Sequence, residues 1–267
     1  MARIIAVANQ KGGVGKTTTC VNLASALADM NYRTLMADLD PQGNASVGCG
    51  IDARSLEVSA LDVMQAECGV AEALVQVEKL NLDVLPSNAD LTAAEVTLMQ
   101  VDGREFRLRE ALEKIAHQYA WIIIDCPPSL NLLTLNALTA ANSVLIPMQC
   151  EYYALEGLAS LLETIEQVRI SVNPGLEIEG LLRTMYDARN NLSGAVSEQL
   201  VEHFGDKVYR TLIPRNVRVA EAPSHGLPVL RYAPASKGAL AYLGLAGELL
   251  RRNRNRQAGF PLDTPGV

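Results

Sequence analysis

We expect the chain to fold as a single α/β domain, with a mostly parallel sheet flanked by helices on both faces. Its 267 residues, 49% of them hydrophobic, are enough for one sizeable core and exclude a disordered chain. Apolar runs alternate with helical patterns from end to end, the order that a parallel sheet requires. The first apolar run leads directly into a glycine-rich loop and a helix, and no stretch approaches the roughly 18 apolar residues of a membrane helix.

The elements follow from the hydrophobic pattern, taken in chain order. Residues 3–8 (RIIAVA) form a nearly continuous apolar run, as a strand buried on both faces does. Residues 17–30 repeat apolar residues at helical spacing on one face. The strand of residues 80–85 is closed by Pro86. The predicted strands are residues 3–8, 33–37, 80–85, 121–124, 143–148, 177–184 and 228–230, and the predicted helices are residues 17–30, 89–100, 104–117, 155–172, 193–204 and 237–252. We place the domain at residues 1–256 and a flexible tail at residues 257–267, which contain proline and glycine.

Composition limits the classes of function. The net charge is −7, which taken alone argues against nucleic acid as a partner, although a local basic patch stays possible. The five cysteines are odd in number and form no CxxC pair, which indicates reduced thiols in a cytoplasmic protein. The short apolar run near the N-terminus does not match a secretory signal, so we expect a cytoplasmic location.

The loop of residues 10–18 (QKGGVGKTT) has the composition of a phosphate-binding loop. Its glycines allow backbone N–H groups to turn toward anionic oxygens, and the following helix adds the positive end of its dipole. Lys16 supplies a charge for the β- and γ-phosphates and Thr17 a hydroxyl for Mg²⁺. The usual P-loop pattern fails at one place, because Gln10 stands where it has glycine and a second lysine, Lys11, follows.

Two aspartates follow predicted strands. Asp125 ends the run WIIID, where a carboxylate beside the loop can hold Mg²⁺ through water. Asp40 follows the second strand, and Asp38 lies two residues before it. Either carboxylate alone can also be a simple cap of the next element.

The segment KGGVGKTT is a deviant Walker A box, and with it the chain resembles the ParA/MinD family of P-loop ATPases. The motifs DLDPQGN, IIIDCPPS, QCEYYALEG, MYDARNNLS and RNVRVAEAPSHGLPV resemble those of its chromosome-partitioning (ParA/Soj) branch. The resemblance implies an ATP hydrolase with ATP and Mg²⁺ as cofactors, which dimerises when ATP is bound. It implies catalytic roles for Lys11, Lys16 and Asp40, with Lys11 reaching the partner's nucleotide and Asp40 positioning the attacking water. It also implies nucleotide contacts from Lys11, Gly12, Gly13, Val14, Gly15, Lys16, Thr17 and Thr18, metal contacts from Thr17 and Asp125, and a switch loop at residues 40–48 that senses the γ-phosphate.

Residues 213–216 (IPRN) resemble the adenine-binding segment of the family. In this interpretation Pro214 packs on the base and Asn216 bonds to its edge. A strand-to-helix turn with Asn216 as helix cap explains the same composition, so both interpretations stay open.

The resemblance also implies two macromolecular partners, non-specific double-stranded DNA bound by the ATP dimer and a ParB-type centromere-binding protein. It points to Arg189, Arg215 and Arg218 as DNA-phosphate contacts, and so to association with the nucleoid. Phosphate contacts need only charge and reach. The alternative is that these arginines pair with nearby acids such as Asp187 and Glu221. The arginines of residues 251–256 either extend the DNA surface or complement the dipole of the last helix, and the second interpretation is slightly favoured.

Three other functions are weighed against partitioning. A MinD-like division-site ATPase needs an amphipathic C-terminal helix, which Gly259, Pro261 and Pro265 would break, so we expect no membrane partner. A metabolic P-loop synthetase would have no use for Lys11 acting on a second subunit. An iron–sulfur reductase needs a cluster cysteine soon after the Asp125 strand, and none lies between Pro127 and Gln149.

Overall fold

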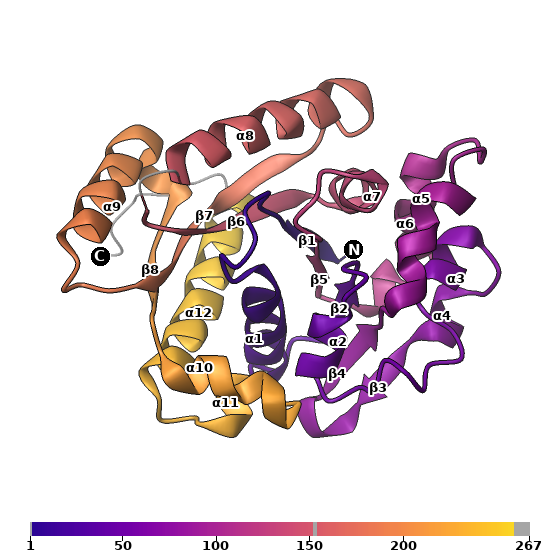
Figure 1. The fold of residues 1–267 in the computed structure, drawn as a ribbon, viewed down its shortest axis with the longest axis horizontal. Coiled ribbons are helices and arrows are strands. Elements are labelled where there is room, and N and C mark those ends of the chain that lie inside the picture. Colours follow the sequence, from indigo (N-terminus) through magenta and orange to yellow (C-terminus); the bar gives the residue numbers. More distant parts are fainter. Residues whose placement is uncertain (1, 152–153, 259–267) are drawn as a thin grey trace.

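The computed structural model describes residues 2–151 and 154–258, which form one sheet with helices on both sides (Figure 1). The sheet has eight strands in the order β3-β4-β2-β5-β1-β6-β7-β8. Every neighbouring pair is parallel except β3 with β4, which is antiparallel at one edge. The strands are β1 Arg3–Val7, β2 Thr34–Asp38, β3 Val75–Val77, β4 Leu82–Leu85, β5 Trp121–Asp125, β6 Ser143–Gln149, β7 Glu177–Tyr186 and β8 Val208–Pro214. The predicted α/β class with a mostly parallel sheet is confirmed.

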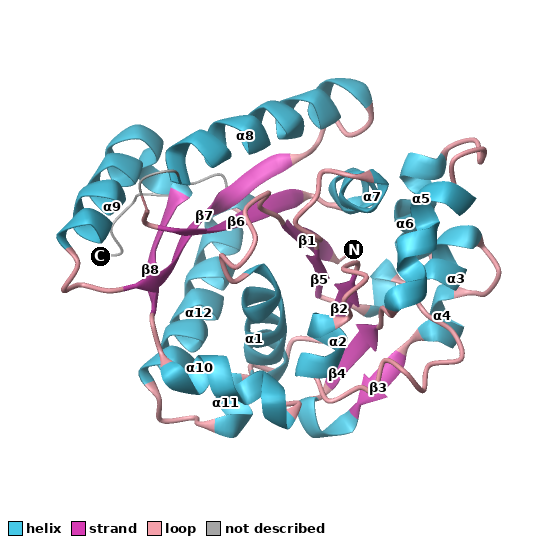
Figure 2. Cartoon of the chain, viewed as in Figure 1, coloured by secondary structure: helices cyan, strands magenta, loops and turns pink. Residues whose placement is uncertain are grey.

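Helices of very different length connect these strands (Figure 2). The α-helices are α1 Lys16–Asp29, α2 Asn44–Gly48, α3 Ala60–Gln65, α4 Val70–Ala73, α5 Ala94–Thr97, α6 Arg107–Glu113, α7 Leu132–Ala140, α8 Ala154–Ser171, α9 Asn191–Phe204, α10 Val217–Glu221, α11 Val229–Tyr232 and α12 Lys237–Gln257. Short 3₁₀ turns include η3 (Arg104–Phe106) and η6 (Ala222–His225). Figure 1 shows α7 and α8 on one side of the sheet and α1 and α12 on the other.

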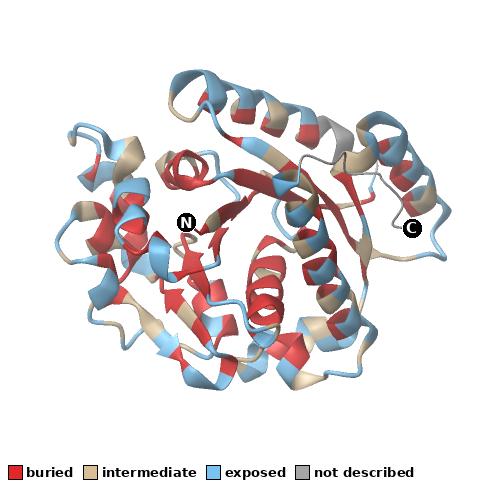
Figure 3. Ribbon diagram, turned by 180° about the vertical axis from the view of Figure 1, so that it is seen from behind, coloured by how far each residue is buried: buried red, intermediate tan, exposed pale blue. Residues whose placement is uncertain are grey.

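The core has two halves, one on each face of the sheet. Successive residues of β5 point to opposite faces, so Ile122 and Ile124 pack with α6, α7 and α8 while Ile123 packs with α1 and α12. All three isoleucines are fully buried. Burial of the central strands on both faces (Figure 3) explains why their sequences read as continuous apolar runs.

One predicted strand is wrong. Residues 228–230 do not extend the sheet, because Val229–Tyr232 form the helix α11 with Pro228 as its cap. The carbonyl of Pro228 accepts the N–H groups of Arg231 and Tyr232, and the N–H of Val229 donates to Asn22 Oδ1 at 2.7 Å. These bonds use the backbone groups that a strand needs for its neighbour.

Other boundaries differ by less. The predicted helices of residues 89–100 and 104–117 are broken into 3₁₀ turns and the short helices α5 and α6, with Gly103 at a left-handed φ of 66° between them. The edge strands β3 and β8 and the helix α7 were not predicted. The last helix runs to Gln257, past the predicted end at residue 252, and residues 259–267 of the predicted tail lie outside the described part of the chain.

The register of the central strands brings the carboxyl ends of β1, β2 and β5 together at one edge of the sheet. Asp125 at the end of β5 pairs with Val7 at the end of β1 and with Asp38 at the end of β2. The glycine-rich loop leaves β1 at this same edge. Carboxyl ends of parallel strands are where open α/β sheets bind ligands.

Candidate active site

The glycine-rich loop joins β1 to α1 and has the conformation of an anion cradle. Gly13 and Gly15 have φ values of 73° and 88°, in the left-handed region that glycine tolerates best. A Cβ atom on Gly12 or Gly13 would meet no other atom within 4 Å, so this side of the loop is open. The loop therefore presents bare backbone at the N-terminus of α1, where an anion is favoured.

Neighbouring strands hold the back of the loop in place. Thr184 on β7 donates its hydroxyl to the carbonyl of Val14 at 2.7 Å, and Gln149 at the end of β6 donates to the carbonyl of Gly13 at 3.1 Å. Asn9 accepts the N–H of Lys11 at 3.0 Å and donates to the carbonyl of Pro147 at 2.8 Å. These anchors were not predicted from the sequence, although their positions at strand carboxyl ends could have pointed to them.

Lys16 lies inside the loop rather than in solvent. It is buried, and its ammonium donates to the carbonyl of Lys11 at 3.1 Å. Burial lowers the pKa of Lys16, while the nearby Asp125 carboxylate acts in the opposite direction. A partly desolvated cation beneath the cradle is suited to phosphate oxygens.

Asp125 supplies an unsatisfied carboxylate at the end of β5. The residue is fully buried, its Oδ1 accepts the Cys20 thiol at 3.4 Å, and its Oδ2 has no hydrogen-bond partner among the described residues. Burial, with the charge of Asp38 nearby, raises the pKa of Asp125, and the side chain of Thr17 acts in the opposite direction. A buried, unpartnered oxygen beside a threonine hydroxyl fits Mg²⁺, which prefers oxygen ligands and keeps several waters. Among the described residues no cluster of three or more His, Cys, Asp or Glu side chains could hold a metal by itself.

The two aspartates after β2 have different environments. Asp38 is fully buried, and its carboxylate accepts the N–H and hydroxyl of Ser46 at 2.8 and 2.7 Å and the N–H of Asp40 at 3.1 Å. Asp40 is half-buried, and among the described residues its carboxylate accepts one hydrogen bond, from the N–H of Gln42 at 3.0 Å. The Asp38 carboxylate is thus occupied in folding the loop before α2, whereas Asp40 keeps acceptor capacity for a water molecule.

Lys11 points away from its own loop. Its ammonium forms an ion pair with Glu151, with 2.6 Å between Nζ and Oε2, and the two side chains are 40% and 50% exposed. The sequence did not single out Glu151. A lysine paired with an exposed carboxylate at the surface can leave it and pair with an anion of higher charge.

A cavity lies beside the loop where the adenine-binding segment was predicted. It measures about 230 Å³ and is lined by Gly15, Thr18, Pro214 and Asn216, among others. Asn216 also caps α10, with its Oδ1 accepting the N–H groups of Arg218 and Val219 at 2.9 and 3.3 Å. The cap uses only the oxygen of Asn216, so the two interpretations of this segment are compatible.

The three arginines predicted to touch DNA lie near one another on the surface. The N–H of Arg215 donates to the carbonyl of Tyr186 at 3.1 Å, which places it beside the turn that carries Arg189. Arg189 pairs with Asp187 at 2.8 Å, and Arg218 pairs with Glu221 at 2.9 Å. The ion pairs considered as the alternative are therefore formed in the single chain, but both arginines stay exposed.

The arginine cluster of residues 251–256 has a role that neither sequence interpretation anticipated. Arg252 is buried and bonds to Glu248 and to the carbonyls of Asp206 and Val208. Arg256 bonds to the buried carboxylate of Glu179 at 2.6 Å. These two side chains fasten α12 to the sheet, because their charges find partners inside the fold rather than at the helix terminus or in solvent.

The first comparison is with known sequences. A family model described as "AAA domain" matches residues 2–178. The chromosome partitioning protein ParA of Caulobacter vibrioides is 54% identical over 258 residues, which are 96% of this chain and 97% of that protein. The sporulation initiation inhibitor protein Soj of Bacillus subtilis is 53% identical over 249 residues, which are 93% of this chain and 98% of that one.

The second comparison is with solved structures. Cobyrinic acid a,c-diamide synthase from Mycobacterium smegmatis, with a bound ATP analogue and magnesium, is 39% identical with a TM-score of 0.85 and covers 99% of this chain and 100% of its own. The cell division ATPase MinD of Pyrococcus furiosus is 28% identical with a TM-score of 0.78, covering 94% of this chain and 99% of its own. Both likenesses extend over at least 94% of this chain, at lower identity than the 54% and 53% of the two relatives above.

Proposed function

This chain belongs to the ParA/Soj family of chromosome-partitioning proteins, and from that premise we propose that it is a Mg²⁺-dependent ATPase that dimerises on ATP. The dimer binds double-stranded DNA without sequence preference, and a ParB-type partner stimulates hydrolysis so that a chromosome or plasmid is segregated. The proposed setting is the cytoplasm, on the nucleoid. In the described residues no helix is long and apolar enough to span a membrane.

Nucleotide binding follows from the cradle. The backbone N–H groups of residues 12–18 and the Lys16 ammonium face the phosphates, and Pro214 and Asn216 line the cavity proposed for the base. Thr17 and Asp125 would hold Mg²⁺, directly and through water. When bound, the ion neutralises charge on the phosphate oxygens.

Hydrolysis needs a water molecule aligned with the γ-phosphate. Asp40 is proposed to orient it, because the Asp40 carboxylate accepts one hydrogen bond, whereas the Asp38 carboxylate accepts three, two from Ser46 and one from the backbone N–H of Asp40. A positioned carboxylate of this kind contributes about 10²–10⁴-fold to a rate.

The outward orientation of the Lys11 side chain is the single observation that carries the proposal. A lysine that only helped its own loop would point into it, as Lys16 does, yet Lys11 is paired outward with exposed Glu151. In a dimer, the partner's phosphates offer this ammonium a more strongly charged site than one carboxylate. A metabolic synthetase, the function in the name of the Mycobacterium smegmatis neighbour, gives no reason for such a lysine.

The test is sedimentation velocity of the wild-type chain without nucleotide, with ADP, and with ATP and Mg²⁺. We expect a dimer only with ATP. Lys11→Ala should keep ATP binding and stay monomeric, and Lys79→Ala, another lysine outside the site, should dimerise as wild type. A Lys11→Ala protein that dimerises normally would contradict the proposal.

A further inference from the structure

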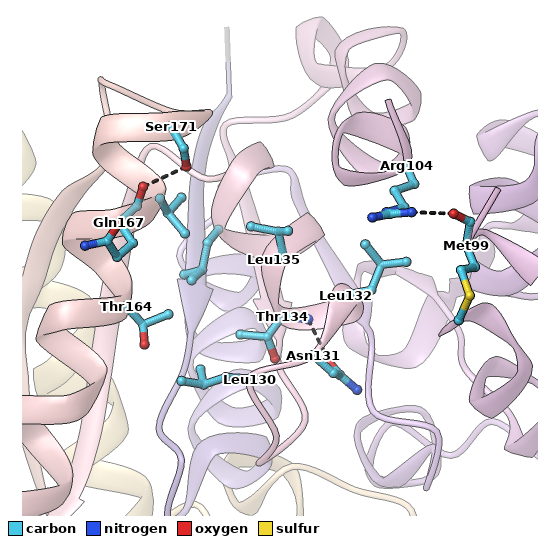
Figure 4. A pocket seen from close by; sticks show the side chains of 12 residues that line it. Met99, Arg104, Leu130, Asn131, Leu132, Thr134, Leu135, Thr164, Gln167 and Ser171 are labelled. Carbon is cyan, nitrogen blue, oxygen red and sulfur yellow. Dashed lines mark hydrogen bonds between the residues drawn. The ribbon is translucent and has the colours of Figure 1, made fainter. Parts of the chain in front are cut away.

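A small hollow lies beside the nucleotide cradle, between α1, α2 and the turn η6. It measures about 290 Å³, and its lining includes Thr17 and Thr18 of α1, Val47 of α2 and Pro223 of η6. The groove of about 520 Å³ between α7 and α8 (Figure 4) is separate, since none of the described residues that line it belongs to α1 or to the glycine-rich loop. Of these two spaces, the smaller one therefore reaches the proposed nucleotide site.

The hollow shares a wall with the cavity proposed for the base. Thr18 lines both spaces. Val219 and Ala220 line the base cavity, whereas Ala222 and Pro223, which follow closely in the chain, line the hollow. The segment that carries these four residues stands between the two spaces. A movement of this segment into the hollow would therefore widen the base cavity.

Hydrogen bonds join residues 216–227 into one unit, which consists of α10 and η6 with their caps. At its start, the Asn216 side chain caps α10 by accepting backbone N–H groups. At its end, the N–H of Gly226 donates to the carbonyl of Pro223 at 3.0 Å, which closes η6. We call this unit the α10–η6 arm, and its internal bonds allow it to shift as one piece.

The arm meets the rest of the fold at two places where a glycine lets the chains approach closely. Val219 packs so tightly against Gly238 on α12 that a Cβ atom on Gly238 would collide with it. Gly226 packs against Gly50, and a Cβ atom on Gly226 would lie 2.8 Å from the Cα of Gly50 and 3.5 Å from the carbonyl oxygen of Val47. Since no flexible side chain lies between the two backbones at Gly226, a displacement of α2 passes directly to the arm.

The helix α2 links this second contact to the nucleotide site. Its first residue, Asn44, lines the hollow together with Thr17, which is proposed to hold Mg²⁺. The loop before α2 carries Asp40, and Ser46 within α2 is bonded to the Asp38 carboxylate at the end of β2. The γ-phosphate would therefore act on the first end of α2, and the last end of α2 acts on the arm.

We propose that the α10–η6 arm is a device that couples release of the base to the presence of the γ-phosphate. With ATP bound, α2 is held against η6 and presses the arm onto the base. With ADP bound, α2 is no longer held, and the arm turns about the contact of Val219 with Gly238 into the hollow, so that the base cavity opens and ADP leaves. The device rests on the proposed nucleotide site but needs neither DNA nor a second protein.

The dissociation rates of two nucleotides test the device. Fluorescent ADP and a fluorescent non-hydrolysable ATP analogue, both labelled on the ribose, are displaced by excess unlabelled nucleotide in a stopped-flow instrument with Mg²⁺. The protein is kept at a concentration at which sedimentation velocity shows a monomer, because dimerisation would itself slow release. From the wild-type chain, ADP should dissociate about tenfold faster than the analogue.

Replacing Gly226 should slow the release of ADP. The new methyl group of Gly226→Ala wedges the arm away from Gly50 and onto the base, so ADP should dissociate about fivefold more slowly or less readily still. Gly205→Ala, in the turn after α9, is the matched control, because its φ is 51° and a Cβ atom there meets no atom within 4 Å. Both variants bear the strain of a left-handed alanine, but only Gly226→Ala should slow ADP release.

Filling the hollow should have the same effect by a second route. Val47 is 43% exposed and lines the hollow, so Val47→Phe takes up the space into which the arm turns. ADP should again dissociate more slowly, whereas a cavity that was merely damaged would release both nucleotides faster. Val201→Phe on α9, at a valine that is 46% exposed, is the control and should release ADP as wild type. Thermal unfolding checks that each variant is folded, and Val47→Phe carries the test if Gly226→Ala is not.

Three results would overturn the device. The first is equal dissociation rates of ADP and of the analogue from the wild-type chain. The second is ADP release from Gly226→Ala as fast as from Gly205→Ala, and the third is ADP release from Val47→Phe as fast as from Val201→Phe. A wild-type chain that binds neither labelled nucleotide would instead refute the proposed nucleotide site itself.

Discussion

The nucleotide cradle and the arginine surface are built in opposite ways. In the cradle, Lys16, Asp38 and Asp125 are buried, and hydrogen bonds from β6 and β7 fix the loop between them. On the surface of Arg189 and Arg218, each charged group is exposed and has an acidic neighbour only a few residues away in sequence. The first region is organised before any ligand arrives, whereas the second gains a function only if something draws the arginines from their partners. In the proposed function, nucleotide binding therefore needs little rearrangement of the cradle, whereas DNA binding has to draw the arginines from their acidic neighbours.

Removing the cation of the cradle should have the largest effect. Lys16→Ala takes away a buried charge that no neighbour can replace, so ATP affinity should fall by a factor of about 10² or more, as expected when a buried charge-assisted contact is lost. Isothermal titration with ATP and Mg²⁺ measures it. Lys114→Ala, on the surface after α6, is the control and should bind as wild type. ATP affinity within a few-fold of wild type in Lys16→Ala would mean that the loop is not the phosphate site.

The two aspartates after β2 should separate catalysis from folding. Asp40→Ala should reduce turnover by about 10²–10⁴-fold while ATP binding and dimerisation persist. Asp38→Ala removes the acceptor of three hydrogen bonds around Ser46, so it should lower thermal stability as well as activity. Steady-state ATPase assays and thermal unfolding of both variants decide between them. An Asp40→Ala protein with normal turnover would move the water-positioning role to another residue.

The same contrast can be tested by comparing the folding stability of two variants, one at a buried arginine and one at an exposed arginine. Arg252→Ala leaves the buried carboxylate of Glu248 without its cation and two backbone carbonyls without their donor, which should cost about 3–5 kcal/mol of folding free energy. Arg189→Ala should leave the unfolding midpoint unchanged, because Arg189 is 89% exposed. Urea unfolding followed by circular dichroism provides the measurement. Similar midpoints for the two variants would show that α12 is not fastened to the sheet through Arg252.

Hydrophobic pattern predicted the fold well where an element has one clear role in the core. The central strands and the helices α1, α8 and α9 lie within about two residues of their predicted bounds. The helix α7 was missed because LLTLNALTA is apolar on nearly all sides, so it shows no helical periodicity, and almost all of it is buried. The strand β8 was missed because Arg210 and Thr211 interrupt its apolar run at the edge of the sheet.

The candidate site shows the same division. The phosphate loop is one continuous motif and its acids follow predicted strands, so both could be identified from the sequence. Its anchors Thr184, Gln149 and Glu151 lie about 135–170 residues farther along the chain, and only the strand order brings them to the loop. Arg252 and Arg256 were misjudged for the corresponding reason, because their partners Asp206, Val208 and Glu179 are distant in sequence.

We expect the smallest effect on DNA binding, which tests the exposed arginine surface. A single chain has net charge −7 and is repelled by DNA as a whole, so two or three arginines cannot hold it there. A dimer presents two copies of the surface around Arg189, Arg215 and Arg218, and each phosphate contact should add about −0.9 to the log–log slope of affinity against salt. Arg189→Ala and Arg218→Ala should therefore each flatten the slope and weaken all sequences alike, without changing ATP-driven dimerisation.

Asp187 and Glu221, the acidic neighbours of Arg189 and Arg218, provide a second test of DNA binding. The Arg189 guanidinium lowers the pKa of Asp187 to about 2, so Asp187 is ionised at neutral pH and competes with DNA phosphate for the same guanidinium. Asp187→Asn and Glu221→Gln should consequently raise DNA affinity by a few-fold at low salt, opposite in sign to the arginine variants. Binding of duplexes of unrelated sequence, measured by anisotropy with ATP at several salt concentrations, is the readout, and Arg109→Ala on α6 is the matched control. If the acid variants bind DNA no better and the arginine variants bind it no worse, the DNA surface lies elsewhere, and exposed Arg251 and Arg254 are the next residues to replace.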